Sequence, residues 1–264
     1  MSDSARSARA WLRRARDLRD RRTREAEGTC IVEGIRQVAS AVETGHEVEA
    51  LLVDPARLHS DVAWAAVNDA VERGATLVEL TSRDMERISS RDNPIGLVAI
   101  VRWAPASLSA LAIEPDGIYL VADDIHDPGN LGTLVRATDA AGGKALIVLG
   151  GTDPAHPSAM RASLGTSFHL PIHAATSHNE LFAWADGRCR TVATSAHASG
   201  EVWDTDLREP AAIIVGNEAR GLAPETVSRC DITVRIPMLG TATSLNVSVA
   251  AGVLLYEAVR QSRS

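Results

Sequence analysis

Residues 236–257 read Ile236-Pro-Met-Leu-Gly-Thr-Ala-Thr-Ser-Leu-Asn-Val-Ser-Val-Ala-Ala-Gly-Val-Leu-Leu-Tyr-Glu257. The stretch begins as the end of a strand, passes through a loop of Gly, Thr and Ser, and continues as a helix rich in small residues. Ser244 is the expected N-cap of that helix, because a serine hydroxyl can accept from the free N–H groups of the first turn. A loop that enters a helix N-terminus leaves backbone N–H groups free for a ligand, so the stretch predicts a binding loop in an α/β protein.

The composition predicts a globular α/β chain of one or two domains. The chain has 264 residues, of which 45% are hydrophobic but only 3% aromatic. Such a length allows a sizeable core. The core must be built from Val, Leu, Ile and Ala, which suits a buried parallel sheet. We expect no membrane span and no secretory signal, because no long uncharged apolar run stands out and the arginine-rich N-terminus lacks an apolar segment.

The basic charge is concentrated at the N-terminus. The net charge is −7, yet residues 1–25 carry nine arginines against four acidic residues. A basic segment on an acidic body predicts a local contact with RNA phosphates, the alternative being a solvated helix with i,i+4 ion pairs. The candidate RNA-binding residues are Arg13, Arg14, Arg21, Arg22, Arg24 and Arg36.

The spacing of the cysteines argues against a metal site. Cys30, Cys189 and Cys230 lie far apart and form no CxxC pair, so neither a zinc site nor a disulfide framework is predicted. A reduced, cytoplasmic setting is the simplest interpretation. No metal is expected.

Two α/β blocks are visible along the chain. The first is predicted to contain a helix at Ile31–Val42, a strand at Val48–Val53, a helix at Ala63–Arg73, a strand at Thr76–Leu80, a short helix at Ser82–Ile88 and a strand at Ile95–Val101. A linker is expected at 104–117, where Pro105, Pro115 and Gly117 interrupt any periodicity. The second block is predicted to contain strands at Ile118–Asp123, Ala145–Leu149, Thr191–Ser195, Ala212–Val215 and Ile232–Ile236, with helices at Leu131–Ala141, Ser158–Leu164, Asn179–Ala185 and Leu245–Arg260. Strands that alternate with helices predict a mostly parallel sheet covered on both faces.

Two further segments carry polar residues at predicted strand ends. Asp124-Ile-His-Asp-Pro-Gly-Asn-Leu-Gly-Thr-Leu-Val-Arg136 forms a turn and enters a helix, which Asn130 can cap. Arg136 lies on an otherwise apolar helix, where a guanidinium is costly unless it faces a partner or solvent. Ile214-Val-Gly-Asn-Glu-Ala-Arg-Gly221 follows an apolar strand, and ligands bind at such strand ends in open α/β sheets. Each segment read alone is also compatible with an ordinary turn.

Together, in this order, the three segments resemble the motifs of the SpoU/TrmH family of RNA ribose 2′-O-methyltransferases, in the SPOUT superfamily. The resemblance implies a C-terminal trefoil-knotted α/β methyltransferase domain that binds S-adenosylmethionine and forms a homodimer. It implies that Ser248, Ala251 and Gly252 permit close helix packing at the dimer interface.

The resemblance also implies roles for individual residues. Those implied at the reaction centre are Asn130, Arg136, Glu218, Ser244 and Asn246. Those implied to bind the cofactor are Gly216, Asn217, Ile236, Met238, Leu245 and Val247. In the family the arginine that matches Arg136 activates the ribose 2′-OH. Because guanidinium is not expected to lose its proton, Arg136 is either strongly perturbed or lowers the 2′-OH pKa and positions the neighbouring phosphate.

The N-terminal block resembles, more weakly, the smaller α/β substrate-binding domain of ribosomal-RNA members, through Cys30-Ile-Val-Glu-Gly-Ile-Arg-Gln-Val38 and Asn93-Pro-Ile-Gly-Leu-Val-Ala-Ile-Val101. We therefore expect an arginine-rich arm (1–25), an RNA-binding domain (26–103), a linker (104–117) and a methyltransferase domain (118–264). The expected activity is 2′-O-methylation of a ribose in rRNA of the large subunit (23S). The alternatives are a tRNA ribose 2′-O-methyltransferase and a non-catalytic RNA-binding or ribosome-assembly factor.

Overall fold

The computed structural model describes residues 3–208 and 210–263. These residues form two compact units. The N-terminal unit comprises the described residues up to Ala104 together with Asp153–His169. The C-terminal unit comprises Pro105–Thr152 and the described residues from Leu170 onward. The segment 153–169, which the sequence analysis assigned to the methyltransferase domain, therefore packs with the first unit.

The N-terminal unit is a four-stranded mixed sheet with helices on both faces. Its elements are α1 (Asp3–Asp17), α2 (Arg21–Glu27), β1 (Thr29–Glu33), α3 (Ile35–Glu43), β2 (Val48–Val53), α4 (Asp61–Glu72), β3 (Thr76–Glu79), α5 (Ser82–Ile88), β4 (Leu97–Arg102) and α7 (Pro157–Ala162). The strand order is β1-β4-β2-β3. β4 is antiparallel to β1 and to β2, whereas β3 is parallel to β2. The predicted strand Val48–Val53 and helix Ser82–Ile88 are confirmed with the same bounds.

The described part of the arginine-rich segment belongs to the core of this unit. Leu12 and Ala15 of α1, and Leu18 directly after it, are buried against the apolar face that Ile31 and Leu52 help to form. Burying one leucine side chain stabilises a fold by about 1.5–3 kcal/mol. Arg9, Arg13 and Arg16 of this packed helix are exposed.

The C-terminal unit is an eight-stranded sheet with helices on both faces. Its elements are β5 (Ala106–Ser107), β6 (Ile118–Asp123), α6 (Pro128–Ala140), β7 (Ala145–Leu149), β8 (Ile172–Ala175), α8 (His178–Ala185), β9 (Arg190–Thr194), β10 (Gly200–Glu201), β11 (Ala211–Val215), α9 (Pro224–Arg229), β12 (Ile232–Arg235) and α10 (Val247–Ser262). The strand order is β10-β12-β9-β11-β6-β7-β8-β5, and neighbouring strands are parallel. The predicted parallel sheet is confirmed.

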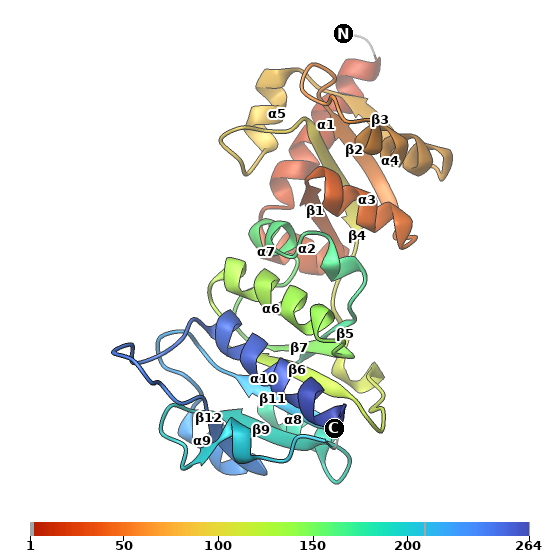
Figure 1. Ribbon diagram of the computed structural model, residues 1–264. Coiled ribbons are helices and arrows are strands. Elements are labelled where there is room, and N and C mark those ends of the chain that lie inside the picture. The colour runs from red at the N-terminus through yellow and green to blue at the C-terminus, as the bar shows by residue number, and fades with distance from the viewer. Residues whose placement is uncertain (1–2, 209, 264) are drawn as a thin grey trace. The chain divides into compact units, whose positions relative to one another are not determined.

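Alternation along the strands decides which helices cover which face. Tyr119 and Val121 of β6 point to the side where Leu181 and Trp184 of α8 are buried. On the other face α6 and α10 lie side by side, as Figure 1 shows, and pack against each other and against β6. The helices that follow the first and third sequence motifs are thus neighbours, although more than a hundred residues separate them.

One expectation about the elements was wrong. The predicted helix at Ile31–Val42 is a strand, β1, followed by the shorter helix α3. Gly34 makes the break, with a φ of 130° that residues with a side chain rarely adopt. The predicted linker at 104–117 contributes strand β5, which pairs with β8.

Candidate active site

The loops that follow β6 and β11 meet at the carboxyl edge of the large sheet. β6 and β11 are neighbours, and the strand order runs outward from them in opposite directions. Open α/β sheets bind ligands at such a switch point, because the loops on either side diverge and leave a crevice. The polar residues of the first two motifs lie in these loops.

Glu218 connects the first two motifs. Its carboxylate accepts hydrogen bonds from the backbone N–H of His126 (3.2 Å) and of Asp127 (3.1 Å), and from Asn130 Nδ2 (3.0 Å). Partial burial would raise the pKa of the Glu218 carboxyl, but the hydrogen bonds from Asn130 and from the two backbone N–H groups hold this pKa below its usual value. Glu218 is therefore a carboxylate at neutral pH and fixes the entry to α6.

Asn130 joins this pair to the third motif. Its Oδ1 accepts from Asn246 Nδ2 at 2.9 Å, and its backbone carbonyl accepts from Ser248 Oγ at 3.1 Å. The Asn130 amide thus donates to Glu218 and accepts from Asn246, which fixes its orientation. Asn130, Glu218 and Asn246, which were predicted together at the reaction centre, lie in one hydrogen-bonded chain.

The caps of the two helices differ from the expected ones. Asp127 caps α6, because its side chain accepts from the backbone N–H of Asn130 at 2.7 Å. Asn246 caps α10 by accepting from the N–H of Ser248 at 2.9 Å. The expected caps, Asn130 and Ser244, were each a few residues off. This leaves the Asn130 amide free to link the motifs.

The loop after β11 is tightly packed. A Cβ at Gly216 would lie 2.5 Å from the backbone of Gly221, so only glycine fits there. Asn217 donates from Nδ2 to the Asp124 carbonyl at 3.0 Å. The Asp124 carboxylate pairs with Arg220 at 2.8 Å and with His126 at 2.9 Å. Asp124 itself has a φ of 56°, a conformation that non-glycine residues adopt rarely and often at functional sites.

A cavity of about 650 Å³ opens beside the third motif. Its lining includes Ile236, Met238 and Leu245, which were predicted to bind a cofactor, and Ser244, which was predicted at the reaction centre. The other three predicted cofactor residues do not line this cavity. Val247 begins α10, Gly216 lies in the loop after β11, and Asn217 lines a second cavity of about 600 Å³ together with Asp124 and Arg220.

Sequence reasoning missed half of this cavity. Residues 194–197, at the end of β9 and in the loop after it, line the cavity. Glu201 and Arg235, which form an ion pair at 3.0 Å, line it too. Arg235 Nε is buried without a hydrogen-bond partner among the described residues, so a donor is left for a ligand. The signal available in the sequence was the end of the predicted strand Thr191–Ser195, because all carboxyl ends of a parallel sheet share one edge.

Comparison with known proteins identifies the family. Residues 117–256 match the SpoU rRNA Methylase family, and residues 11–99 match an MRM3-like substrate binding domain. The first match covers more than half of the chain and contains all three motifs. The chain belongs to the SpoU rRNA methylase family.

Members of this SpoU family resemble the chain over nearly its whole length. A Streptomyces viridochromogenes protein named 23S rRNA (uridine(2479)-2′-O)-methyltransferase is 35% identical over 251 residues, 92% of this chain and 87% of the relative. An AdoMet-bound rRNA methyltransferase structure from Sinorhizobium meliloti has a TM-score of 0.85 at 29% identity and covers 94% of both chains. A SpoU methyltransferase from S. viridochromogenes in complex with AdoMet has a TM-score of 0.84 at 32% identity, covering 95% of this chain and 98% of that one.

Arg136, the predicted activating residue of this SpoU protein, lies on α6 but outside the hydrogen-bonded chain. It follows Asn130 by six residues, which places the two about 120° apart around the helix axis. Its side chain is exposed, like those of Thr133 and Asp139 on the same helix. The structure thus brings Asn130, Glu218 and Asn246 together and leaves Arg136 facing outward.

The six predicted RNA-binding arginines fall into two groups. Arg13, Arg21, Arg22 and Arg36 are exposed, and Arg14 is half-buried between Glu27 and Glu49. Arg24, by contrast, is only 3% exposed and bonds Asp153 and the backbone carbonyls of Leu18 and Arg19. Its donors face the interior, so the prediction for Arg24 is corrected to a structural role.

The small residues of α10 were also expected at an interface. Ser248 and Ala251 are instead buried within the chain, where α10 packs on α6. Gly252 differs, because a Cβ there would meet nothing within 4 Å. In the described part of the chain no His, Cys, Asp or Glu cluster is arranged to hold a metal ion, and no helix is long and apolar enough to cross a membrane.

Proposed function

We propose that this protein transfers a methyl group from S-adenosylmethionine to a ribose 2′-oxygen of ribosomal RNA, in the large subunit (23S). The observation that carries the proposal is the hydrogen-bonded chain from Asn246 through Asn130 to Glu218, which joins three motifs beside a cavity. The family, and relatives named for this activity, support it.

The cavity beside α10 fits the proposed cofactor. Its volume of about 650 Å³ lies within the range of about 300–1,000 Å³ that is usual for small-molecule sites. Ile236, Met238 and Leu245 would pack against the apolar parts of the cofactor, and Glu201 and Arg235 would meet its charged groups. When bound, S-adenosylmethionine supplies an electrophilic methyl carbon attached to sulfur.

The residues at the edge of the sheet would orient the acceptor ribose. Asn130 and Glu218 fix the loop before α6, and Ser244 lies in the wall of the cavity. Methyl transfer requires oxygen, methyl carbon and sulfur in line, so positioning supplies much of the rate. Arg136 would lower the 2′-OH pKa or hold the adjoining phosphate, since a guanidinium keeps its proton.

The N-terminal unit supports rRNA as the substrate. It contains the match to the MRM3-like substrate binding domain. The exposed arginines Arg13, Arg21, Arg22 and Arg36 would contact phosphates of an RNA loop, because protein readout of RNA sequence favours unstacked elements. The protein would encounter an rRNA substrate in the cytoplasm, which is its proposed location.

The protein is further proposed to act as a homodimer with a trefoil knot in its C-terminal unit. Val249, Gly252 and Tyr256 recur at i, i+3 and i+7 on α10 and form a stripe on its outer face, where Val249 is 53% and Tyr256 is 54% exposed. Exposed apolar stripes of this kind favour helix packing against a partner. The trefoil knot is proposed from the resemblance of the motifs to the SpoU/TrmH family.

The proposal is tested by methyl transfer. The protein is incubated with labelled S-adenosylmethionine and, separately, with large-subunit rRNA, small-subunit rRNA and tRNA, and the labelled nucleoside is identified by mass spectrometry. We expect label on a ribose 2′-oxygen of large-subunit rRNA. Label in tRNA alone would favour the tRNA enzyme instead, and a chain that binds no S-adenosylmethionine would favour the non-catalytic RNA-binding factor.

A further inference from the structure

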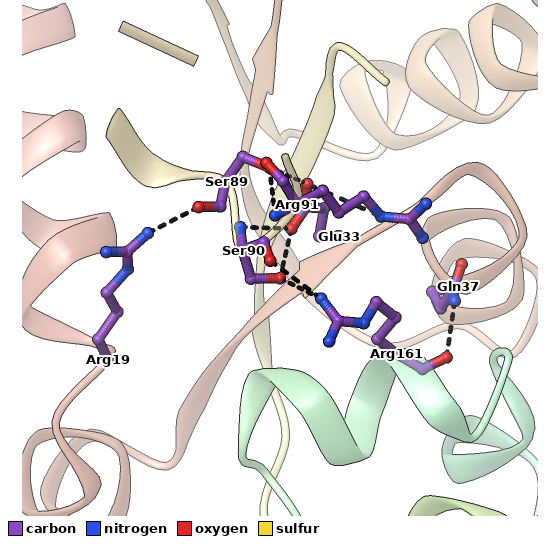
Figure 2. A network of polar contacts seen from close by, with 7 residues as sticks. All are labelled: Arg19, Glu33, Gln37, Ser89, Ser90, Arg91 and Arg161. Carbon is purple, nitrogen blue, oxygen red and sulfur yellow. Dashed lines mark hydrogen bonds and ion pairs between the residues drawn. The ribbon is translucent and has the colours of Figure 1, made fainter. Parts of the chain in front are cut away.

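A buried carboxylate organises the loop after α5 in the N-terminal unit. Glu33, at the end of β1, is buried and accepts from Ser89 Oγ, from the backbone N–H of Ser90 at 2.9 Å and from Ser90 Oγ at 2.8 Å. Figure 2 shows these groups converging on the Glu33 side chain. Glu33 therefore fixes the conformation of the loop from its buried side.

Three arginines from separate segments gather around this loop, as Figure 2 shows. Arg19, which follows α1, donates to the Ser89 carbonyl at 2.9 Å. Arg161, on α7, donates to Ser90 Oγ at 2.7 Å and to the Ser90 carbonyl at 3.3 Å. Arg91, in the loop itself, has its Nε 3.9 Å from Glu33. We call Arg19, Arg91 and Arg161 the arginine cluster.

The arginine cluster has more charge and more donors than the loop uses. Among the described residues, Glu33 is the one carboxylate that pairs with a guanidinium of the cluster, through Arg91, so three positive charges face one negative charge in a chain of net charge −7. A guanidinium has five N–H donors, but Arg19 uses one nitrogen here and Arg161 uses one. Arg91 Nε is buried and makes no hydrogen bond among the described residues. The cluster therefore offers donors to an anion.

A small cavity adjoins the arginine cluster. Its volume is about 200 Å³, and its lining combines the apolar residues Ile31, Ile88 and Pro157 with Arg19, Glu33 and Ser90. This volume is below the range of about 300–1,000 Å³ for whole small-molecule ligands. It suits one flat group of a larger ligand whose anionic part lies on the arginines.

From these contacts we propose that the arginine cluster binds phosphodiester groups of an unpaired RNA strand, with one base placed in the adjoining cavity. The inference rests on the proposed function and adds a binding site for the substrate, built from arginines outside the set predicted from the sequence. Guanidinium groups suit this task because they bind phosphate oxygens through two parallel N–H bonds. Pro157 and Ile88 would supply the apolar contacts that few aromatic residues are available to make.

The test is the salt dependence of RNA binding by the full-length protein. Affinity for a protein-free 23S rRNA transcript is measured by filter binding across a salt series, for wild type and for Arg19→Gln, Arg91→Gln, Arg161→Gln and the triple variant. Each lost phosphate contact is expected to weaken binding and to lower the slope of log K against log salt by about 0.7, hence by about 2 in the triple variant.

Two controls separate binding from folding. Arg73→Gln removes the arginine that follows α4 and pairs with Asp69 in the same unit, and we expect it to keep the wild-type slope. Arg161→Lys retains the charge and is expected to keep the slope while weakening binding, because lysine cannot bind bidentately. Thermal unfolding and S-adenosylmethionine affinity should match wild type in every variant compared.

The outcomes distinguish the two proposals. If wild type binds and methylates rRNA but the triple variant keeps the same affinity and slope, the arginine cluster only braces the loop, and this inference fails alone. If wild type binds S-adenosylmethionine but neither binds nor methylates rRNA, the proposed function fails and the inference fails with it. Loss of slope in the cluster variants alone, with Arg73→Gln unchanged, supports the site.

Discussion

At the scale of single residues, Glu218 makes stability depend on pH in a defined direction. Its hydrogen bonds hold the carboxyl pKa below that of the unfolded chain, so folding favours the carboxylate. The stabilisation is complete above the unfolded value of about 4.3 and is lost as the pH falls through the lower folded pKa. We expect Glu218→Gln to lower the melting temperature at pH 7, and the gap to wild type to shrink toward pH 3. Calorimetry from pH 3 to 7 measures this, and a constant gap would contradict it.

The role proposed for Arg136 is in catalysis and not in folding. It is exposed on α6 and lies apart from the cavity lining, so its removal should affect neither the fold nor cofactor binding. We expect Arg136→Ala to reduce turnover by a factor on the order of 10² or more, the scale on which removing one positioned hydrogen-bond donor lowers kcat. Methyl-transfer kinetics and calorimetric titration with S-adenosylmethionine measure the two effects. Arg208→Ala, which removes an exposed arginine paired with Asp206, is the control, and normal turnover of the Arg136 variant would refute the assignment.

The limits of sequence reasoning are visible in particular residues. Asn130, Glu218 and Asn246 could be predicted together because the motif order identifies them. The helix N-caps were predicted at the wrong residues. Asp127 and Asn246 are as suitable for capping as Asn130 and Ser244, and only the path of the backbone decides which side chain caps the helix. In the sequence nothing distinguishes Arg24 from the exposed arginines beside it. Its burial depends on pairing with Asp153, which lies 129 residues away.

At the scale of elements, the Arg24–Asp153 ion pair ties α2 to the segment before α7. Both side chains are buried and their charged atoms lie 2.7 Å apart. We expect Arg24→Met to reduce the free energy of unfolding by about 3–5 kcal/mol, because it leaves the Asp153 charge buried without its partner. Urea denaturation measures the loss. Arg24→Met with Asp153→Leu should recover much of it, and a double variant no more stable than the single one would contradict this account.

Helices and strands were predictable where the local pattern has one solution. β6 and β7 are continuous apolar runs bounded by turns, and the structure has them at the predicted residues. The strand β1 was predicted as helix because the apolar residues Ile31, Val32, Ile35 and Val38 fit a helical spacing. The single glycine at position 34 was not a strong enough local signal to end the predicted helix. β8 went unpredicted because its four residues become a strand only by pairing between β7 and β5.

At the scale of the whole molecule, the sequence does not reveal which segments of the chain form the first unit. Residues 153–169 lie within the catalytic half of the chain, yet they pack on β1 and α3. Local periodicity indicates the helix α7 but carries no information about which sheet it covers. The parallel sheet, in contrast, follows from alternating strands and helices, because short connections leave few other arrangements.

The proposed homodimer gives the last prediction. Val249 and Tyr256 are exposed on α10, and a dimer through this stripe would bury both. A carboxylate in the centre of an apolar interface loses its hydration without gaining a partner, so Val249→Glu should convert the dimer to a monomer. Light scattering coupled to gel filtration measures the mass. Val62→Glu, at an exposed valine of α4 that is 65% accessible, is the matched control and should stay dimeric. If Val249→Glu remains a dimer, the interface lies elsewhere; if wild type is a monomer, the stripe serves another partner and the proposed homodimer is wrong.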